Sequence, residues 1–114
     1  METMKTRDVA ETFEARAKRD PAYRAALLSE AVSEFVDGEF DVAKALLRTA
    51  IKGAGGYARL SARIGVPEKS LVRMFGSAGN PTAKNLKAVI DALRKQSGVR
   101  LVLKAERVRA KRAA

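Results

Sequence analysis

The sequence predicts an all-α domain of five to six helices followed by one short C-terminal strand. Apolar residues recur at spacings of three and four along most of the chain, which is the period of helices with one buried face. Glycine, proline and N-cap residues divide these stretches into pieces of helix length. Only the residues after Gly98 alternate with a period of two, which is typical of a strand. The length of 114 residues suits a single domain with a modest core.

Residues 1–19 are expected to be an N-terminal extension that contains a helix. Val9, Phe13 and Ala17 stand at helical spacing and predict this helix over residues 6–18. It carries few apolar groups, so its stability would depend on packing against the rest of the chain.

Residues 20–98 are the expected central domain. Asp20 followed by Pro21 predicts an N-cap and a proline at the first helical position, where the missing N–H costs nothing. This helix would end near Asp37, because Gly38 suits a left-handed C-cap. Its apolar face consists of Leu28, Ala31, Val32, Phe35 and Val36.

The next helix is expected to start with Asp41 as its N-cap and to stop at the glycine-rich residues 52–56. Its apolar stripe is wide, which predicts a buried helix. The stripe consists of Val42, Ala43, Leu46, Leu47, Ala50 and Ile51.

Residues 57–74, YARLSARIGVPEKSLVRM, predict two short helices joined by a sharp turn at Gly65. Such a turn needs a positive φ at one residue and a small side chain where the helices approach, and Gly65 and Ser61 meet these needs. Pro67 is expected at the first position of the second helix, with Glu68 near the positive end of its dipole. This is the geometry of a helix-turn-helix. The residues expected in the shared core are Leu60, Ile64, Val66, Leu71, Met74 and Phe75.

The second of these helices would leave a polar and largely cationic face exposed. In a helix-turn-helix, this helix lies in the major groove of DNA, where Lys and Arg donate to guanine and Glu accepts from cytosine. We expect Lys69 and Arg73 to be the main base-reading residues, with Glu68 and Ser70 beside them.

A polar loop over residues 76–81 leads to a last helix, capped by Thr82 and ending near Ser97 and Gly98. Its apolar stripe consists of Leu86, Val89, Ile90 and Leu93. Side chains near the start of this helix, and one at the start of the first motif helix, are expected to contact phosphates and so to position the protein on DNA. These residues are Tyr57, Asn80, Thr82, Lys84 and Asn85.

Residues 99–105 are predicted to form the strand, with Val99, Leu101 and Leu103 on one face. A single strand cannot satisfy its own backbone, and the same strand of a second copy is the economical partner, which suggests a homodimer. The alternative is an extended tail that runs over the surface. Residues 106–114 are basic and poor in apolar groups, so a disordered or frayed tail is expected there.

The charge of +10 is unevenly distributed. Residues 1–41 carry six Lys or Arg and ten Asp or Glu, whereas residues 42–114 carry 17 and three. A basic block on a folded segment favours a polyanionic partner such as double-stranded DNA, because phosphates that are neutralised release counterions. The alternative is that these residues only solvate an ordinary surface.

The residue types argue against an enzyme and against a metal or other cofactor. The chain has no Cys and no His, which excludes thiolate and imidazole chemistry and disulfides. Asp37, Glu39 and Asp41 cluster, but without His, Cys or a glycine-rich phosphate loop they fit a polar turn. No apolar run suggests a membrane span or a secretion signal, so the cytoplasm is the expected compartment.

The segments FDVAKALLRTAIKGAGGYARL, ARIGVPEKSLVRMF and GNPTAKNL resemble the Cro-like, or phage-repressor-like, helix-turn-helix domains, and more closely the small HigA-like antidote proteins of toxin–antitoxin modules. The similarity covers roughly residues 21–103. It implies a lambda-repressor-like bundle and a dimeric autorepressor that binds a palindromic operator and neutralises a RelE- or ParE-type toxin. Tyr57, Ser61 and Pro67 depart from the family pattern, so the operator sequence does not transfer.

The sequence therefore leaves two main functions as alternatives. The favoured one is a sequence-specific DNA-binding repressor, either the antitoxin of such a module or a stand-alone, prophage-type regulator without a toxin. The other is a protein-binding antidote whose acidic N-terminal 40 residues dock a basic toxin. Amphipathic helices that pack on the core explain those acids equally well.

Overall fold

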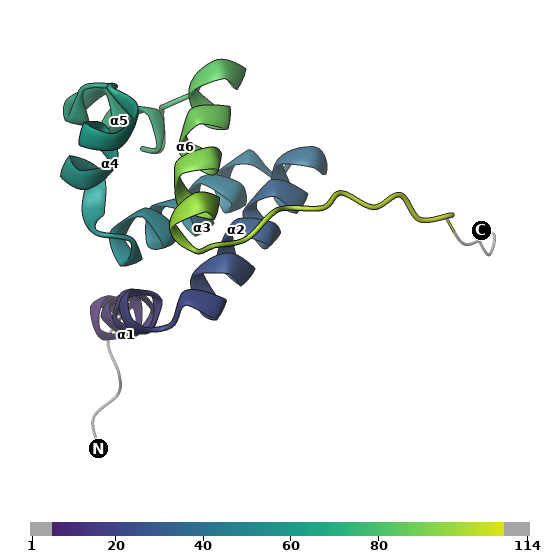
Figure 1. Cartoon of the computed structure of the whole chain (residues 1–114), viewed down its shortest axis with the longest axis horizontal. Coiled ribbons are helices and arrows are strands. Elements are labelled where there is room, and N and C mark those ends of the chain that lie inside the picture. Colours follow the sequence, from purple (N-terminus) through teal and green to yellow (C-terminus); the bar gives the residue numbers. More distant parts are fainter. Residues whose placement is uncertain (1–5, 109–114) are drawn as a thin grey trace.

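The computed structural model describes residues 6–108, with side chains from Thr12 onward, and this part of the chain forms six α-helices and no strand. Figure 1 shows the helices gathered into one body, from which the segment after the last helix extends. The predicted all-α class and number of helices are confirmed. The helices are α1 (Thr6–Arg19), α2 (Pro21–Val36), α3 (Phe40–Gly53), α4 (Gly56–Ile64), α5 (Glu68–Met74) and α6 (Ala83–Gln96).

Helix α3 is the central element of the body. It packs against α1, α2 and α4, while α4 also contacts α5 and α6, and α6 returns to α2. Apolar residues from all six helices meet in one core, which fixes the short helices α4 and α5 relative to the rest. The largest fully buried side chains are Leu28, Leu47, Ile51, Leu71, Phe75 and Val89.

The junction of α1 and α2 follows the predicted pattern. The Asp20 carboxylate accepts a hydrogen bond from the Tyr23 N–H at 3.1 Å, which confirms Asp20 as the N-cap of α2. The end of α1 is held by the Arg24 guanidinium, which donates to the Ala17 carbonyl at 2.6 Å. The Arg16 guanidinium lies 4.3 Å from the centre of the Tyr23 ring, a cation–π contact between the two helices.

Replacing Asp20 by alanine should lower the thermal unfolding midpoint by a few degrees, because the Tyr23 N–H loses its acceptor. The Tyr23 N–H, assisted by Arg16, holds the pKa of Asp20 below its usual value. This contribution is therefore complete above the ordinary pKa of aspartate and is lost as the pH falls through the lowered pKa. Thermal melts at a series of pH values should show the unfolding midpoint falling at acid pH, and this fall should be smaller in Asp20→Ala. Asp20→Asn, which keeps the acceptor, should retain most of the stability at neutral pH.

Two expected helix starts are wrong by one or two residues. Glu39, and not Asp41, occupies the cap position of α3, and Asp41 lies in the first turn. The helix starts earlier because Phe40 packs against Phe35 of α2, with ring centroids 6.2 Å apart. Pro67 lies just outside α5, where its carbonyl accepts the Leu71 N–H at 3.1 Å.

Residues 99–105 form no strand in the single chain that the structure describes. They are extended, and the strand was expected to pair with a second copy, so the strand stays a prediction. Residues 106–108 of the expected basic tail are also extended and exposed. Residues 109–114 of that tail, and residues 1–5 of the N-terminal extension, lie outside the described residues.

Candidate nucleic-acid interface

Helices α4 and α5 are joined by a sharp turn at Gly65. This residue has a φ of +75°, and its N–H donates to the Ser61 carbonyl at 2.9 Å. A Cβ at this position would meet no atom within 4 Å. The turn therefore needs glycine for its left-handed backbone conformation and not for space.

Helix α5 divides into a buried face and an exposed face. Leu71 and the following Phe75 are fully buried, so they anchor the helix in the core. The residues of the opposite face are Glu68, Lys69, Val72 and Arg73, which are exposed, and Ser70, which is half-buried. Within the described part of the chain, none of the three charged side chains makes an ion pair or a hydrogen bond. They are available to a partner.

The loop after α5 is held from beneath by Lys44 of α3. The Lys44 side chain is only 5% exposed, and its Nζ donates to the carbonyls of Gly76 at 3.0 Å and Gly79 at 2.8 Å, with Ser77 at 3.4 Å. Asp41 Oδ1 lies 3.8 Å from the same ammonium group. A lysine this deeply buried is stable as a cation only because these oxygens replace water. Its charge therefore serves the loop and is not part of the exposed basic surface.

A second cation of α3 supports the end of α5. The Arg48 guanidinium donates to the Phe75 carbonyl at 2.5 Å, which satisfies a backbone group that the helix leaves free. The loop also approaches α5 very closely at Gly79. A Cβ on this residue would lie 2.0 Å from the Arg73 carbonyl oxygen and 2.3 Å from that of Met74. Close packing of backbone on backbone thus sets the direction in which the chain leaves α5.

The start of α6 brings together four of the five residues predicted to contact phosphates. The Thr82 hydroxyl accepts the Asn85 N–H at 3.1 Å, so Thr82 is the N-cap as predicted. Thr82, Lys84 and Asn80 are exposed, and Asn85 is half-buried. In Figure 1 the loop from α5 to α6 lies in the upper part of the molecule, and α1 lies in the lower part.

Tyr57, the fifth predicted phosphate contact, lies on α4 and packs against the core. Partial burial raises the pKa of its hydroxyl above the usual value, while the nearby Arg48 charge acts in the opposite direction. The tyrosine is therefore a neutral hydrogen-bonding group at physiological pH.

The sequence pattern did not distinguish the roles of the cations on α3 and α4. Arg59 and Arg63 are exposed on α4 and were not among the predicted contacts, and Arg59 lines a hollow with Glu14, Lys18 and Gln96, at the end of α6 opposite to Thr82. Lys44 and Arg48 were counted with the basic block, but both are structural. The available signal was position, because Lys44 falls beside the buried Ala43 and Leu47 on α3.

Within the described residues, no group of three or more acidic side chains is arranged to hold a metal ion. In the same part of the chain, every helix is too short or too polar to cross a lipid bilayer. Comparison of the chain with protein-family models, with curated proteins and with solved structures finds no match.

Proposed function

We propose that the protein is a sequence-specific DNA-binding repressor of the helix-turn-helix type, a lambda-repressor-like bundle in which α5 is the recognition helix. The observation that carries this proposal is the exposed face of α5, where Lys69 and Arg73 have no partner within the described residues. Such cations can donate to guanine in the major groove, and exposed Glu68 can accept from cytosine. The anchored opposite face supports the rigid presentation that base reading requires.

The surroundings of α5 support contact with the sugar–phosphate backbone. Asn80 lies in the loop that leaves α5, Thr82 is the N-cap of α6 and Lys84 lies in its first turn. An exposed cation and a helix N-terminus at this place suit phosphate oxygens on the groove edge. We further propose that two copies bind an inverted repeat, with recognition helices about 34 Å apart, one turn of duplex.

The narrower role of antitoxin is supported by the sequence resemblance alone. Under this proposal the protein represses its own promoter and neutralises a RelE- or ParE-type toxin. Co-expression with the adjacent gene product should show whether such a partner is neutralised. A regulator without a toxin is the alternative, and it keeps the same DNA interface.

Removal of the proposed base contacts should abolish sequence discrimination. We expect Lys69→Ala and Arg73→Ala each to weaken binding to promoter DNA by about 5- to 150-fold, the equivalent of about 1–3 kcal/mol, with little change for unrelated DNA. Lys84→Ala should weaken both DNAs alike and reduce the slope of log K against log salt by about one. Fluorescence anisotropy with both duplexes over a range of salt concentrations measures all three effects.

Lys95→Ala is the matched control, because Lys95 is an exposed cation in the last turn of α6, far along the helix from Thr82. It should leave discrimination unchanged. If the double variant Lys69→Ala/Arg73→Ala binds the promoter as tightly as the parent does, α5 is not the recognition helix.

A further inference from the structure

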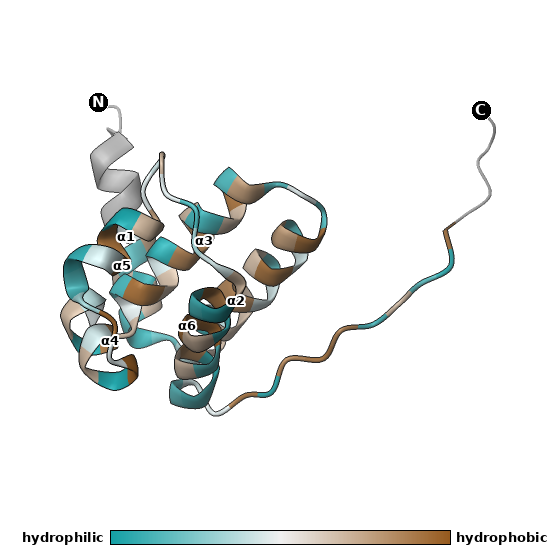
Figure 2. Ribbon diagram, turned by 90° about the horizontal axis from the view of Figure 1, so that it is seen from above, coloured by the Kyte–Doolittle hydropathy of each residue, from teal (hydrophilic) through white to brown (hydrophobic). Residues whose placement is uncertain are grey.

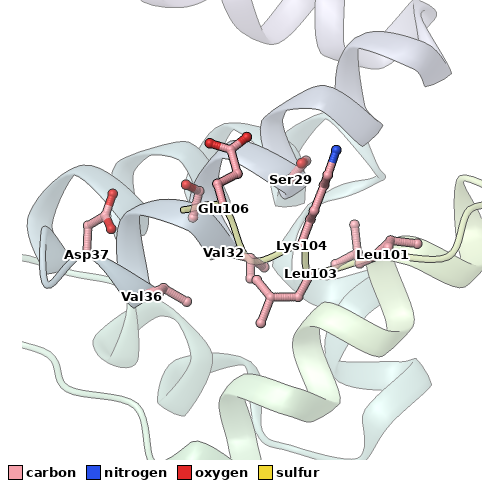
Figure 3. Close-up of a pocket in the computed structure, with 10 residues that line it drawn as sticks. Ser29, Val32, Val36, Asp37, Leu101, Leu103, Lys104 and Glu106 are labelled. Carbon is pink, nitrogen blue, oxygen red and sulfur yellow. The ribbon is translucent and has the colours of Figure 1, made fainter. Parts of the chain in front are cut away.

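Two hollows in the described part of the chain have walls of different chemistry. One separates α2 from the segment after α6, and Figure 3 shows Val32, Val36, Leu101 and Leu103 on its walls, beside two carboxylates and one ammonium group. Figure 2 shows hydrophobic and hydrophilic residues in succession along this segment. The other hollow has a volume of about 640 Å³, and four of its five charged side chains are cations. This second hollow therefore favours one class of ligand, an anion.

The second hollow, which we call the basic hollow, lies where the end of α3 and the start of α4 meet α1 and the end of α6. In Figure 1, α1 lies below the start of α4 and the end of α6. Gln96 of α6 is part of the wall and donates to the Ala54 carbonyl at 2.9 Å. The hollow is thus at the opposite end of α6 from Thr82 and Lys84, which are proposed to contact DNA. Its charged side chains are Glu14, Lys18, Arg24, Lys52 and Arg59.

Two of the four cations in the basic hollow are free. Lys52 Nζ lies 3.2 Å from Glu14 Oε2, so the carboxylate already has a partner. Arg24 donates to carbonyl groups at the end of α1, but its Nε is buried and has no hydrogen-bond partner in the described part of the chain. Lys18 and Arg59 are exposed, and neither makes an ion pair or a hydrogen bond within the described residues. The hollow therefore has positive charge that no acidic residue there neutralises.

A glycine-rich turn adds backbone donors to the wall. Gly55 and Gly56, with φ of +114° and +91°, line the hollow directly before the first turn of α4. A Cβ on Gly55 would lie 2.5 Å from Arg59 Cδ, so glycine at this position leaves room for the Arg59 side chain over the turn. No side chain caps α4, and the N–H groups of residues 56–58 have no acceptor within the helix. These N–H groups carry the positive end of the helix dipole, next to the free cations.

We propose that the basic hollow binds the phosphate groups of a small phosphorylated molecule. Lys18 of α1 and Arg59 of α4 would pair with phosphate oxygens, and the first N–H groups of α4 would donate to the same group. A phosphate group offers about three acceptor oxygens and up to about two negative charges, which suits this number of donors better than one carboxylate does. The volume of the hollow is that of a small-molecule site. None of the described residues that line it is aromatic, so the phosphates and not a stacked base would be recognised.

The site is separate from α5, so its test does not depend on promoter DNA. Isothermal titration calorimetry of the full chain with inorganic pyrophosphate should show one site per chain. Citrate, a carboxylate anion of similar charge, should bind at least about tenfold more weakly, and inorganic phosphate should also bind more weakly because it carries less charge. Lys18→Gln/Arg59→Gln should weaken pyrophosphate binding by about tenfold or more, since each substitution removes a charged donor. Both side chains are exposed, so the thermal melt without ligand should not change.

Nuclear magnetic resonance locates the bound anion. Titration of the labelled full chain with pyrophosphate should shift the backbone amide signals of Gly55, Gly56 and Tyr57 in the parent, and much less in the double variant. Arg63→Gln is the matched control, because Arg63 is an exposed cation in the last turn of α4 and does not line the hollow. It should bind pyrophosphate like the parent.

Four results would overturn the proposal. They are a parent chain that does not bind pyrophosphate, a double variant that binds it as tightly as the parent, citrate that binds as tightly as pyrophosphate, and amide shifts confined to other parts of the chain. A double variant that binds unrelated DNA more weakly, with a smaller salt slope, would assign the hollow to the DNA backbone and also refute a small-molecule site. Loss of promoter discrimination is tested with the α5 variants, so the proposed DNA binding and this site can fail separately.

Discussion

Gly79→Ala is expected to destabilise the protein by about 3 kcal/mol or more, the largest effect we expect for a single added methyl group. The new Cβ would lie 2.0 Å from the Arg73 carbonyl oxygen and 2.3 Å from that of Met74. Both are backbone atoms of α5 and its end, so no side-chain rotation can relieve the overlap. The loop would have to move away from α5, which would also strain the hydrogen bond from Lys44 to the Gly79 carbonyl. Urea unfolding measures the loss.

Gly76→Ala is a close control for this experiment. Gly76 is in the same loop, but a Cβ there would approach the carbonyl oxygens of Val72 and Arg73 only to 3.5 Å, an ordinary contact. Its stability should change by less than about 1 kcal/mol. Equal losses in the two variants would show that the loop does not approach α5 as closely as the structure describes.

Lys44→Met should lower the free energy of unfolding by about 2–4 kcal/mol. Methionine keeps most of the aliphatic volume but removes the donor for the carbonyls of Gly76, Ser77 and Gly79. The Gly76 carbonyl still accepts the Gly79 N–H at 3.0 Å and Ser77 is exposed, so the Gly79 carbonyl loses most, and a buried acceptor left unsatisfied costs about 1–3 kcal/mol. Because some water can enter and replace the lost donor, the loss in unfolding free energy should be smaller than the summed costs of the three lost hydrogen bonds. Because the loop joins α5 to α6, the variant should also bind promoter DNA more weakly.

Lys52→Met provides the comparison on the same helix. Lys52 is a half-exposed lysine whose Nζ lies 3.2 Å from Glu14 Oε2, and a surface ion pair of this kind contributes about 0–1 kcal/mol. Denaturant curves of the two variants should therefore differ clearly. If Lys44→Met is as stable as Lys52→Met, the ammonium group does not hold the loop.

Much of the fold could be predicted from the sequence because local chemistry marks most helix ends. Asp20 and Thr82 are N-caps in the structure as in the prediction, and Gly65 adopts the left-handed conformation that the turn required. The buried face of α5 also follows from periodicity, since Leu71 and Phe75 are four residues apart. The starts of α3 and α5 were misplaced because ring packing and backbone geometry, and not the capping residue type, decided them.

The supports of the candidate site could not be predicted in the same way. Lys44 belongs to a basic stretch, and only its long-range contacts with residues 76–79 distinguish it from a solvated lysine. Gly76 and Gly79 are both glycines of the same loop, and the sequence does not distinguish them. Only the path of the loop makes glycine sterically necessary at position 79. The exposed residues of α5 were identified correctly as a surface. Which of them reads a base stays a prediction.

The loop after α5 is held through hydrogen bonds to its main-chain carbonyl groups. Lys44 and Arg48 donate to carbonyl oxygens, which every amino acid supplies, and the side chains of Ser77, Ala78 and Asn80 are not used. These three positions can therefore be exchanged without loosening the grip. Natural selection or protein engineering can therefore change the side chains that these positions present to a partner without altering the helices that support them.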